Sequence, residues 1–317
     1  MDRKPAWITA AVNSIILEEL KKLDQVFSQP PSIPVVVLKG GAFAFTLYPD
    51  LALRPLSDID LLVPEERLEE AAARLKALGY KELNPEIVPN HRRNVETHFS
   101  FVREGIPLTL ELHWSLAAGK HSLYAPDMAW FWAHTEPLPL PFPTSLQTLD
   151  PTAHLLYLAV HATFCHGEAK LDPKWLYDIH LLVEREGRRI NWGELVGQAA
   201  SFHWADAVAR AFERCSQLFG TRFPEEVLRL LEKDRDEATI KLLERKAFPH
   251  RKGVMVWDTF KTLDWHGRFS LLRAILLPSP AFVRWRYQPK PPWIWPLFYV
   301  YRWFDVMREG VHLLWGK

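Results

Sequence analysis

The sequence has few cysteines, no long apolar run and almost no net charge. Its 317 residues contain two cysteines, Cys165 and Cys215, which are too few for a disulfide framework and are typical of a reducing compartment. The apolar stretch at 293–301 is far shorter than the roughly 20 residues of a membrane-spanning helix, and it contains Pro296. The first residues lack the apolar core of a secretory signal. We therefore expect a cytoplasmic protein.

The small net charge conceals a difference between two parts of the chain. The sequence has 39 Lys and Arg against 38 Asp and Glu, a formal net charge of +1, which argues against a globally basic nucleic-acid binder. From Pro249 onward, however, it has 11 basic against 4 acidic residues. This segment also contains half of the 14 tryptophans, namely Trp257, Trp265, Trp285, Trp293, Trp295, Trp303 and Trp315.

Composition and length predict an ordinary globular protein with more than one part. Hydrophobic residues make up 48% and charged residues 24% of the chain, which excludes bulk disorder. Apolar residues at helical spacing dominate the first residues and those beyond 150, whereas strand-like runs lie between them. We expect an N-terminal helix (1–30), a core with strands (31–135), a proline-rich linker (136–151), a helical domain (152–248) and a basic, aromatic-rich C-terminal segment (249–317).

Two aspartates lie two positions apart in a predicted strand. Residues 35–38 and 58–63 are short apolar runs typical of buried strands, and the second run begins with Asp58 and Asp60. Because side chains alternate along a strand, both carboxylates point to the same face. Two neighbouring carboxylates repel each other and need a cation, and hard oxygen ligands suit Mg²⁺ completed by substrate phosphates.

A Gly-Gly turn joins the first of these strands to a predicted helix over 42–48. Gly40 and Gly41 lack Cβ atoms, so the backbone can approach a ligand, and the first N–H groups of the helix favour an anion. This predicts a triphosphate site, to which Lys39 and Arg54 add charged contacts. Ser57 would contact a phosphate oxygen or cap a turn.

A third acid lies on a predicted hairpin formed by residues 98–104 and 108–114. Alternation places Thr109, Glu111 and His113 on one face of the second strand. We expect Glu111 to complete the metal site as ligand or base, and His113 beside it to line the cleft or contact an acceptor.

The helical part offers His154, His161 and Asp178 as further polar candidates. The sequence has no HExxH motif and no Cys/His spacing typical of zinc sites. Two interpretations are open. These side chains form hydrogen bonds in the core or between domains, or His161 or Asp178 reaches across a cleft to the nucleotide or acceptor.

The tail over 278–317 alternates arginines with aromatic residues. This pattern is compatible with four roles: a segment packed on the helical domain, a surface for a peptide or protein, a membrane-surface contact, or single-stranded RNA binding.

The ordered motifs resemble those of the polymerase-β-like nucleotidyltransferase superfamily, and more closely its group of largely uncharacterised bacterial nucleotidyltransferases. The resemblance covers residues 35–115 strongly and 150–186 and 277–304 more loosely, and it rests on LKG, LYPD, LRPLSDIDLLV, LGY and ELHW, followed by H-x6-H and W-L-x-D-I. It implies an α+β fold, a mixed sheet with flanking helices followed by a helical C-terminal domain. It also implies that Asp58, Asp60 and Glu111 are the metal-binding acids and that Gly40 and Gly41 lie against phosphates.

The expected activity is Mg²⁺-dependent transfer of NMP from an NTP to an acceptor hydroxyl, at a site that holds two metal ions. The acceptor is a small molecule, a peptide, a protein or an RNA end. The alternative is a nucleotidyltransferase fold that is catalytically idle and binds NTP or a partner.

Overall fold

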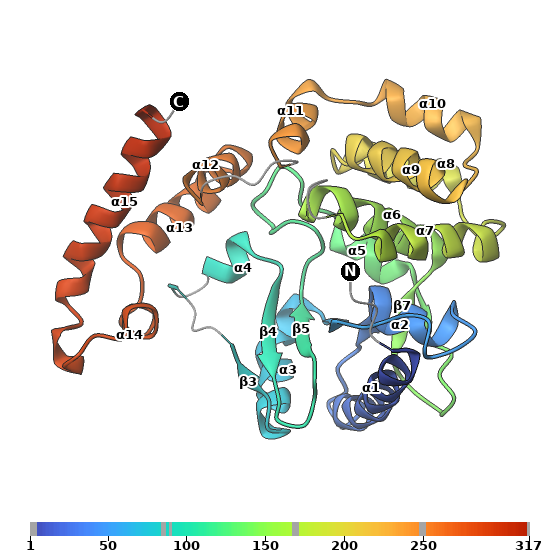
Figure 1. The fold of residues 1–317 in the computed structure, drawn as a ribbon, viewed down its shortest axis with the longest axis horizontal. Helices are drawn as coiled ribbons and strands as arrows, with labels where there is room; N and C mark the ends of the chain where they lie inside the picture. The colour runs from blue at the N-terminus through green and yellow to red at the C-terminus, as the bar shows by residue number, and fades with distance from the viewer. Residues whose placement is uncertain (1–4, 84–86, 89–90, 167–170, 247–251, 316–317) are drawn as a thin grey trace.

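Seven short strands form one mixed sheet near the centre of the molecule (Figure 1). The computed structural model describes residues 5–83, 87–88, 91–166, 171–246 and 252–315. The start of the expected N-terminal helix (1–30) and both ends of the expected C-terminal segment (249–317) therefore lie outside the described residues. In chain order the strands are β1 (Val36–Val37), β2 (Asp58–Leu62), β3 (Lys81–Glu82), β4 (His98–Val102), β5 (Thr109–His113), β6 (Thr135–Pro137) and β7 (Gln147–Leu149).

The spatial order of the strands is β3-β4-β5-β2-β1-β7-β6. β2 pairs in parallel with β5, and β1 pairs in parallel with β7, whereas the other four pairs are antiparallel. The predicted hairpin is therefore confirmed as β4 and β5, and it places β5 beside the strand that carries the two aspartates. Parallel neighbours present the same end of each strand at one edge of a sheet, so side chains at equivalent positions lie close together.

One face of the sheet is covered by α1 (Ala6–Phe27) and α3 (Leu68–Ala77). Ile16, Leu20 and Leu23 of α1 follow helical spacing and are completely buried. They belong to the same hydrophobic cluster as Ile59 and Leu61 of β2. Because alternate residues of β2 face this cluster, the two aspartates between them face the opposite side of the sheet.

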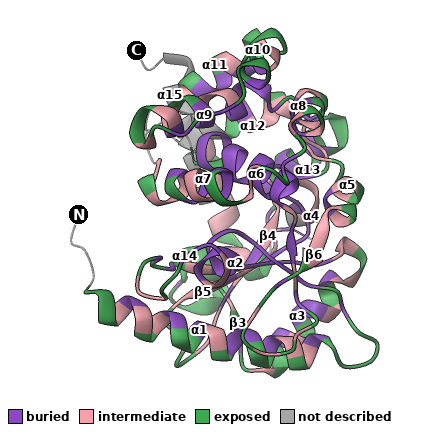
Figure 2. Cartoon of the chain, turned by 90° about the vertical axis from the view of Figure 1, so that its right-hand side faces the viewer, coloured by how far each residue is buried: buried purple, intermediate pink, exposed green. Residues whose placement is uncertain are grey.

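The opposite face is covered by α6 (Pro151–Val160), against which α7 (Pro173–Glu186), α8 (Trp192–Ser201) and α9 (Ala205–Phe219) pack. Figure 2 shows the sheet region between α1 and α3 on one side and α6 and α7 on the other. α6 is buried along its whole length and begins where Pro151 predicts, with the Asp150 side chain accepting from the Ala153 N–H at 2.9 Å. Val36 and Leu62 share one hydrophobic cluster with α6.

The shorter helical elements lie between these layers and at the periphery. They are α2 (Lys39–Thr46), the 3₁₀ turn Glu65–Arg67, α4 (His91–Val95), α5 (Met128–Ala133), the π-helical turn His161–Cys165, α10 (Glu225–Lys233) and α11 (Glu237–Lys246). The architecture confirms the expected α+β class, in which a mixed sheet with flanking helices is followed by helices.

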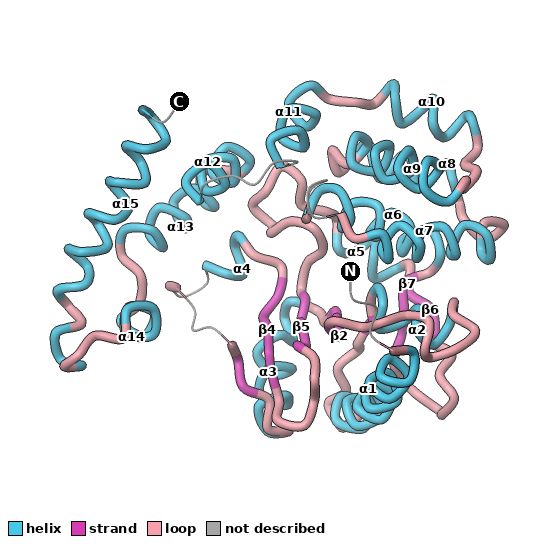
Figure 3. Tube along the Cα trace, in the orientation of Figure 1, coloured by secondary structure: helices cyan, strands magenta, loops and turns pink. Residues whose placement is uncertain are grey.

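The segment 136–151 differs from the proline-rich linker that its composition predicts. It contributes the end of β6 and all of β7, and Gln147 is the parallel partner of Val36 in β1 (Figure 3). The Gln147 N–H donates to the Val35 carbonyl at 2.9 Å, and the Thr148 hydroxyl donates to the Val37 carbonyl at 3.2 Å. Pro139, Pro141 and Pro143 lie in the loop between β6 and β7, and Pro137 is the last residue of β6, which is an edge strand, where a proline is tolerated.

The last part of the chain forms a group of helices at one side of the molecule (Figure 1). This C-terminal group consists of α12 (Lys252–Thr262), α13 (Trp265–Leu276), α14 (Pro280–Tyr287), the 3₁₀ turn Pro292–Ile294 and α15 (Leu297–Trp315). α13 packs against α4, where Ser270 Oγ lies 3.3 Å from His91 Nδ1. Within the described ranges, no helix has the length and hydrophobicity of a bilayer span.

Candidate active site

Three acidic side chains meet where β2 and β5 run side by side. Asp60 and Glu111 are register partners in this parallel pair, and Asp58 lies on the same face two residues before Asp60. His113 connects two of these acids, because its Nε2 lies 3.0 Å from Asp60 Oδ1 and 3.4 Å from Glu111 Oε2. Glu111 and His113 therefore share one face of β5, as their spacing predicts.

Lys39 occupies the position between the end of β1 and the sheet acids. Its Nζ lies 2.7 Å from Asp60 Oδ1, and both side chains are buried. The Lys39 backbone has a φ of 49°, in the left-handed region that non-glycine residues seldom adopt, and its N–H donates to His154 Nε2 at 3.0 Å. α2 thus begins at Lys39, three residues earlier than the sequence predicts, and its first turn lies at the acids.

The two aspartates have opposite electrostatic surroundings. Burial disfavours the charged form of Asp60, but Lys39 and the hydrogen bond from His113 outweigh it and lower its pKa. Burial and the nearby charge of Asp60 instead raise the pKa of Asp58. Among the described residues Asp58 forms no ion pair, and its one hydrogen-bond donor is the Ser57 hydroxyl at 3.1 Å. A half-buried carboxylate beside two other acids, with no cation of its own, fits a site for a divalent metal ion.

His98 adds a fourth polar side chain that the sequence reasoning missed. His98 is the register partner of His113 across the β4–β5 pair, and its Nε2 lies 3.7 Å from Glu111 Oε1. Ligand atoms of His98, Glu111 and His113 all lie within 4.8 Å of one another, which is close enough for a shared metal ion. Burial and the neighbouring His113 lower the pKa of His98 to about 4, so its imidazole is neutral at neutral pH. The sequence feature that could have identified His98 is its position in the predicted hairpin, opposite His113.

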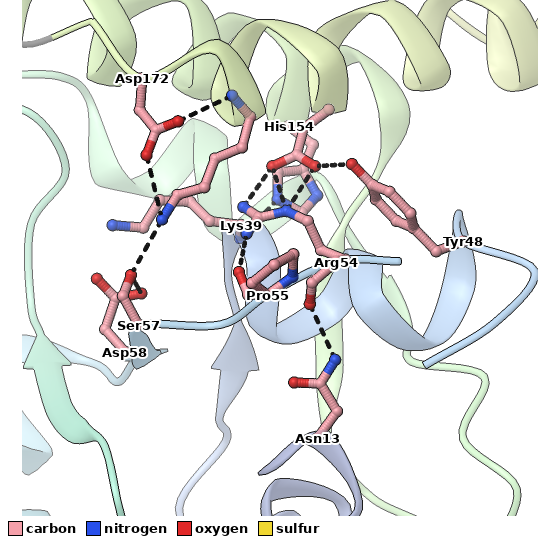
Figure 4. A network of polar contacts seen from close by, with 11 residues as sticks. Asn13, Lys39, Tyr48, Arg54, Pro55, Ser57, Asp58, His154 and Asp172 are labelled. Carbon is pink, nitrogen blue, oxygen red and sulfur yellow. Dashed lines mark hydrogen bonds and ion pairs between the residues drawn. The ribbon is translucent and has the colours of Figure 1, made fainter. Parts of the chain in front are cut away.

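Ser57 and a lysine from α7 form the rim of the site (Figure 4). Lys174 Nζ lies 3.4 Å from Ser57 Oγ and 3.3 Å from a carboxylate oxygen of Asp172, which also caps the start of α7. This lysine is partly exposed, whereas Lys39 is buried. Nothing local in the sequence connects Lys174 to Ser57, because the two residues lie 117 positions apart.

Arg54 and Asp178 form a buried ion pair on the other side of α2 (Figure 4). Arg54 Nη2 lies 2.6 Å and Nε 2.8 Å from carboxylate oxygens of Asp178, and Nη1 donates to the Pro55 carbonyl. The Tyr48 hydroxyl donates to the same carboxylate at 2.7 Å. All three guanidinium nitrogens thus have protein partners, and Asp178 is completely buried, so the structure supports the interpretation of Asp178 as an interdomain hydrogen-bond acceptor.

The two glycines serve the packing of this corner. A Cβ at Gly40 would lie 2.9 Å from Arg54 Nη2 and 2.9 Å from Leu56 Cδ2, and one at Gly41 would lie 3.1 Å from Val37 Cγ1. The absence of a Cβ at Gly40 therefore makes room for the arginine of the buried pair. This requirement explains a glycine there without any ligand.

His161 lies at the start of the π-helical turn and is buried against aromatic rings. Its ring centroid is 5.1 Å from that of Trp175 and 5.8 Å from that of Tyr157. Burial lowers its pKa far below the ordinary value, so the imidazole stays neutral. These contacts resemble those of a core histidine.

A second group of potential ligands lies away from the sheet, at His121, Asp264 and His266. Asp264 caps α13 by accepting from the Gly267 N–H at 2.8 Å, and its other oxygen lies 2.9 Å from His121 Nδ1. The contacts of a helix cap account for this cluster.

Comparisons with known proteins give one family match and two similar solved structures. The family described as "Uncharacterised nucleotidyltransferase" matches residues 6–220. No curated protein matches the chain. Two solved structures of the antibiotic-resistance factor ANT(2″)-Ia are similar, each with a TM-score of 0.42. The solution structure is 13% identical and covers 65% of this chain and 96% of that chain. The crystal structure in complex with adenylyl-2″-tobramycin is 14% identical and covers 59% of this chain and 96% of that chain. Because the family match extends over most of the chain, this protein belongs to the family of uncharacterised nucleotidyltransferases.

Proposed function

We propose that the protein transfers NMP from an NTP to an acceptor hydroxyl, with Mg²⁺ bound at Asp58, Asp60 and Glu111. The observation that carries this proposal is the meeting of three carboxylates on one face of the parallel β2–β5 pair, with Asp60 and Glu111 in register. Family membership supports nucleotidyl transfer as the reaction class. We propose two metal ions at this site, the number that the sequence analysis expects.

The donor set suits a hard divalent cation. Asp58 is half-buried, has a raised pKa and forms no ion pair with any described residue, so a bound cation would relieve its repulsion with Asp60. When bound, the metal ions would polarise the α-phosphate and stabilise the charge that develops on pyrophosphate and on the attacking oxygen. His113 holds the carboxylates of Asp60 and Glu111 in place through its Nε2.

The triphosphate would lie at the start of α2 and along the rim. The Lys39 N–H donates to His154, so the donors at the start of α2 would be the N–H groups of Gly40 and Gly41, together with the Ser57 hydroxyl. Lys174 beside Ser57 provides a cation with partial exposure. Lys39 reaches Asp60 and would orient this carboxylate while its backbone starts α2. We leave Arg54 out of the phosphate contacts because Asp178 and Pro55 occupy its guanidinium.

The acceptor would approach from the side of Glu111 that is open to solvent, where His98 is also partly exposed. His113, His161 and Asp178 are buried, so we assign them to positioning and packing rather than to acceptor contact. The acceptor class stays open among a small molecule, a peptide, a protein and an RNA end. Cys165 and Cys215 form no disulfide in the part of the chain that the structure describes, which favours reaction in the reducing cytoplasm.

One observation favours the alternative of an idle NTP-binding module. The ammonium group of Lys39 already lies on Asp60 Oδ1, which is an oxygen that a metal ion would use. If this contact persisted with nucleotide bound, the site would hold NTP without the full set of metal ligands.

The test is transfer of label from each α-labelled NTP to a cell extract or to pooled hydroxyl acceptors, with and without Mg²⁺. We expect one or more labelled products with the wild-type chain and their loss in Asp58→Asn and in Glu111→Gln. Asp234→Asn is the matched control, since Asp234 is an exposed acid that follows the last residue of α10, far along the chain from the site. Labelled product that survives in Asp58→Asn would overturn the assignment. NTP and Mg²⁺ binding without any transfer would favour the idle module.

A further inference from the structure

Helix α15 carries its large apolar side chains outward. Its exposed residues fall at the spacing of one helical face, at Leu297, Val300, Tyr301, Phe304 and Met307. Leu297 and Phe304 retain 66% and 65% of their accessible surface. An ordinary surface helix buries this face and exposes the polar one.

The Arg302 side chain of α15 faces the protein instead, whereas Arg308 is exposed. Arg302 donates from Nε to the Ile275 carbonyl at 2.8 Å and from Nη2 to the Ala274 carbonyl at 3.2 Å. These carbonyls belong to the last turn of α13, where cations are favoured. This arginine therefore holds the helix in place, while Leu297, Val300, Phe304 and Met307 are exposed. In the same stripe, the exposed Tyr301 ring lies 5.8 Å from the ring of Tyr287 in α14.

α13 also exposes large apolar side chains. Trp265, Phe269, Leu272 and Leu276 recur at helical spacing and are exposed, while the opposite side of the helix buries Gly267, Ser270, Leu271 and Ala274. Ser270 faces α4, where its hydroxyl lies 3.3 Å from His91 Nδ1. The two stripes meet at one point, because the exposed Trp303 of α15 donates from Nε1 to the carbonyl of the exposed Leu276 at 2.7 Å. We call these residues of α13 and α15 the apolar face.

Cations surround the apolar face. In the C-terminal group, the exposed basic side chains are Lys261, Arg268, Arg273, Arg284, Arg286, Lys290 and Arg308. Among the acidic side chains whose burial is described there, Asp264 is exposed and Asp258 is buried. Arg284 lies 5.2 Å from the ring centroid of Trp295, and Lys261 lies 5.3 Å from that of Trp257, so cations and aromatic rings are interleaved.

We propose that the apolar face docks on an anionic lipid surface, with α13 and α15 lying in the headgroup layer. Exposed Trp, Phe, Tyr and Leu next to Lys and Arg is the composition of interfacial helices, which insert their apolar side chains while cations contact lipid phosphates. The core of a protein interface, by contrast, is depleted of charge. A second copy on the same face would bring one basic patch against another, which costs free energy.

The experiment is sedimentation of the full chain with vesicles of phosphatidylcholine alone and of phosphatidylcholine and phosphatidylglycerol in equal parts, at low salt. We expect binding to the anionic vesicles and its loss as salt rises, since Debye screening weakens such contacts. The stripe variant is Phe269→Gln with Leu297→Gln and Phe304→Gln. Its matched control changes exposed apolar residues elsewhere, Trp7→Gln with Leu218→Gln and Leu228→Gln.

A charge variant, Arg284→Gln with Arg286→Gln and Lys290→Gln, keeps the test valid if the stripe variant does not fold. At roughly fivefold per cation, the three substitutions should together reduce binding to anionic vesicles about 100-fold. Its control is Arg188→Gln with Arg222→Gln and Lys233→Gln, which are exposed cations outside the C-terminal group. The proposal is overturned if the wild-type chain does not sediment with anionic vesicles, or if both variants bind as well as their controls. Concentration-dependent dimerisation that the stripe variant abolishes would assign the face to a second copy instead.

Discussion

Arg54 Nη2 lies 2.6 Å from Asp178 Oδ2, and this ion pair joins the loop before β2 to α7. It connects the strand that carries Asp58 and Asp60, the proposed metal ligands, to the helical half of the molecule. Asn13 of α1 contributes to the same corner, because its side-chain amide donates to the Arg54 carbonyl at 2.9 Å.

Asp178→Asn should lower the free energy of unfolding by about 3 kcal/mol, because it leaves a buried guanidinium without its counterion. The double variant Arg54→Met with Asp178→Leu should recover much of this loss, since it removes both charges. Chemical denaturation measures both effects. Full stability in Asp178→Asn combined with lost transferase activity would contradict the structural role and return Asp178 to the acceptor site.

Gly40→Ala should destabilise the fold by about 1 to 3 kcal/mol, because the new Cβ would meet Arg54 and Leu56 at 2.9 Å. The matched control is Gly197→Ala in the middle of α8, where a Cβ would have no neighbour within 4 Å. There, alanine should stabilise by up to about 1 kcal/mol through helix propensity. Equal stability of the two variants in denaturant titrations would disprove the packing argument for Gly40.

His154 should make the fold less stable in acid. Burial lowers its pKa to about 3, against an ordinary value of about 6.5, so the unfolded chain binds a proton that the folded chain does not. The contribution of the neutral His154 to the free energy of unfolding is fully present above pH ~6.5. It is lost as the pH falls toward ~3, and the free energy of unfolding then decreases by about 1.4 kcal/mol per pH unit. His154→Gln keeps an acceptor for the Lys39 N–H and should lack this component. The difference between the two unfolding curves across pH isolates it, and parallel curves would contradict it.

Mg²⁺ should stabilise the wild-type chain and not Asp58→Asn. A ligand that binds only the folded state at tenfold excess over its Kd adds about 1.4 kcal/mol. In the absence of metal, Asp58→Asn should be more stable than wild type, because the raised pKa of Asp58 means that its charge opposes folding. Thermal unfolding with and without Mg²⁺ tests both statements, with Asp234→Asn as control. A similar Mg²⁺ response in all three proteins would rule out Asp58 as a ligand.

The sequence predicted those parts of the site that local spacing determines. The alternation of β2 and β5 placed Asp58, Asp60, Glu111 and His113 on one face, and register pairing brought the strands together as expected. The Gly-Gly turn correctly marked the strand-to-helix transition. The packing role of Gly40 depends on Arg54, which lies fourteen residues further along the chain.

Contacts between distant segments were beyond sequence reasoning. Lys174 reaches Ser57, and His154 accepts from Lys39, across more than a hundred residues in each case. Lys39 was predicted to contact phosphates, and nothing in its neighbourhood indicated a buried pair with Asp60. The sequence did not predict β7, because its three residues follow a proline-rich stretch. Its place in the sheet comes from pairing with β1 rather than from β propensity.

The parallel pairing of β1 with β7 also determines when the sheet can form during synthesis of the chain. β1 lies between β2 and β7, so the sheet stays incomplete until residues 147–149 have been synthesised. A nascent chain released before this point would present an open strand edge one strand away from the aspartates, together with the uncovered partners of α6. Fragments that end near residue 135 should therefore aggregate. The sheet that carries the acids of β2 is complete only when β7 has been added to it.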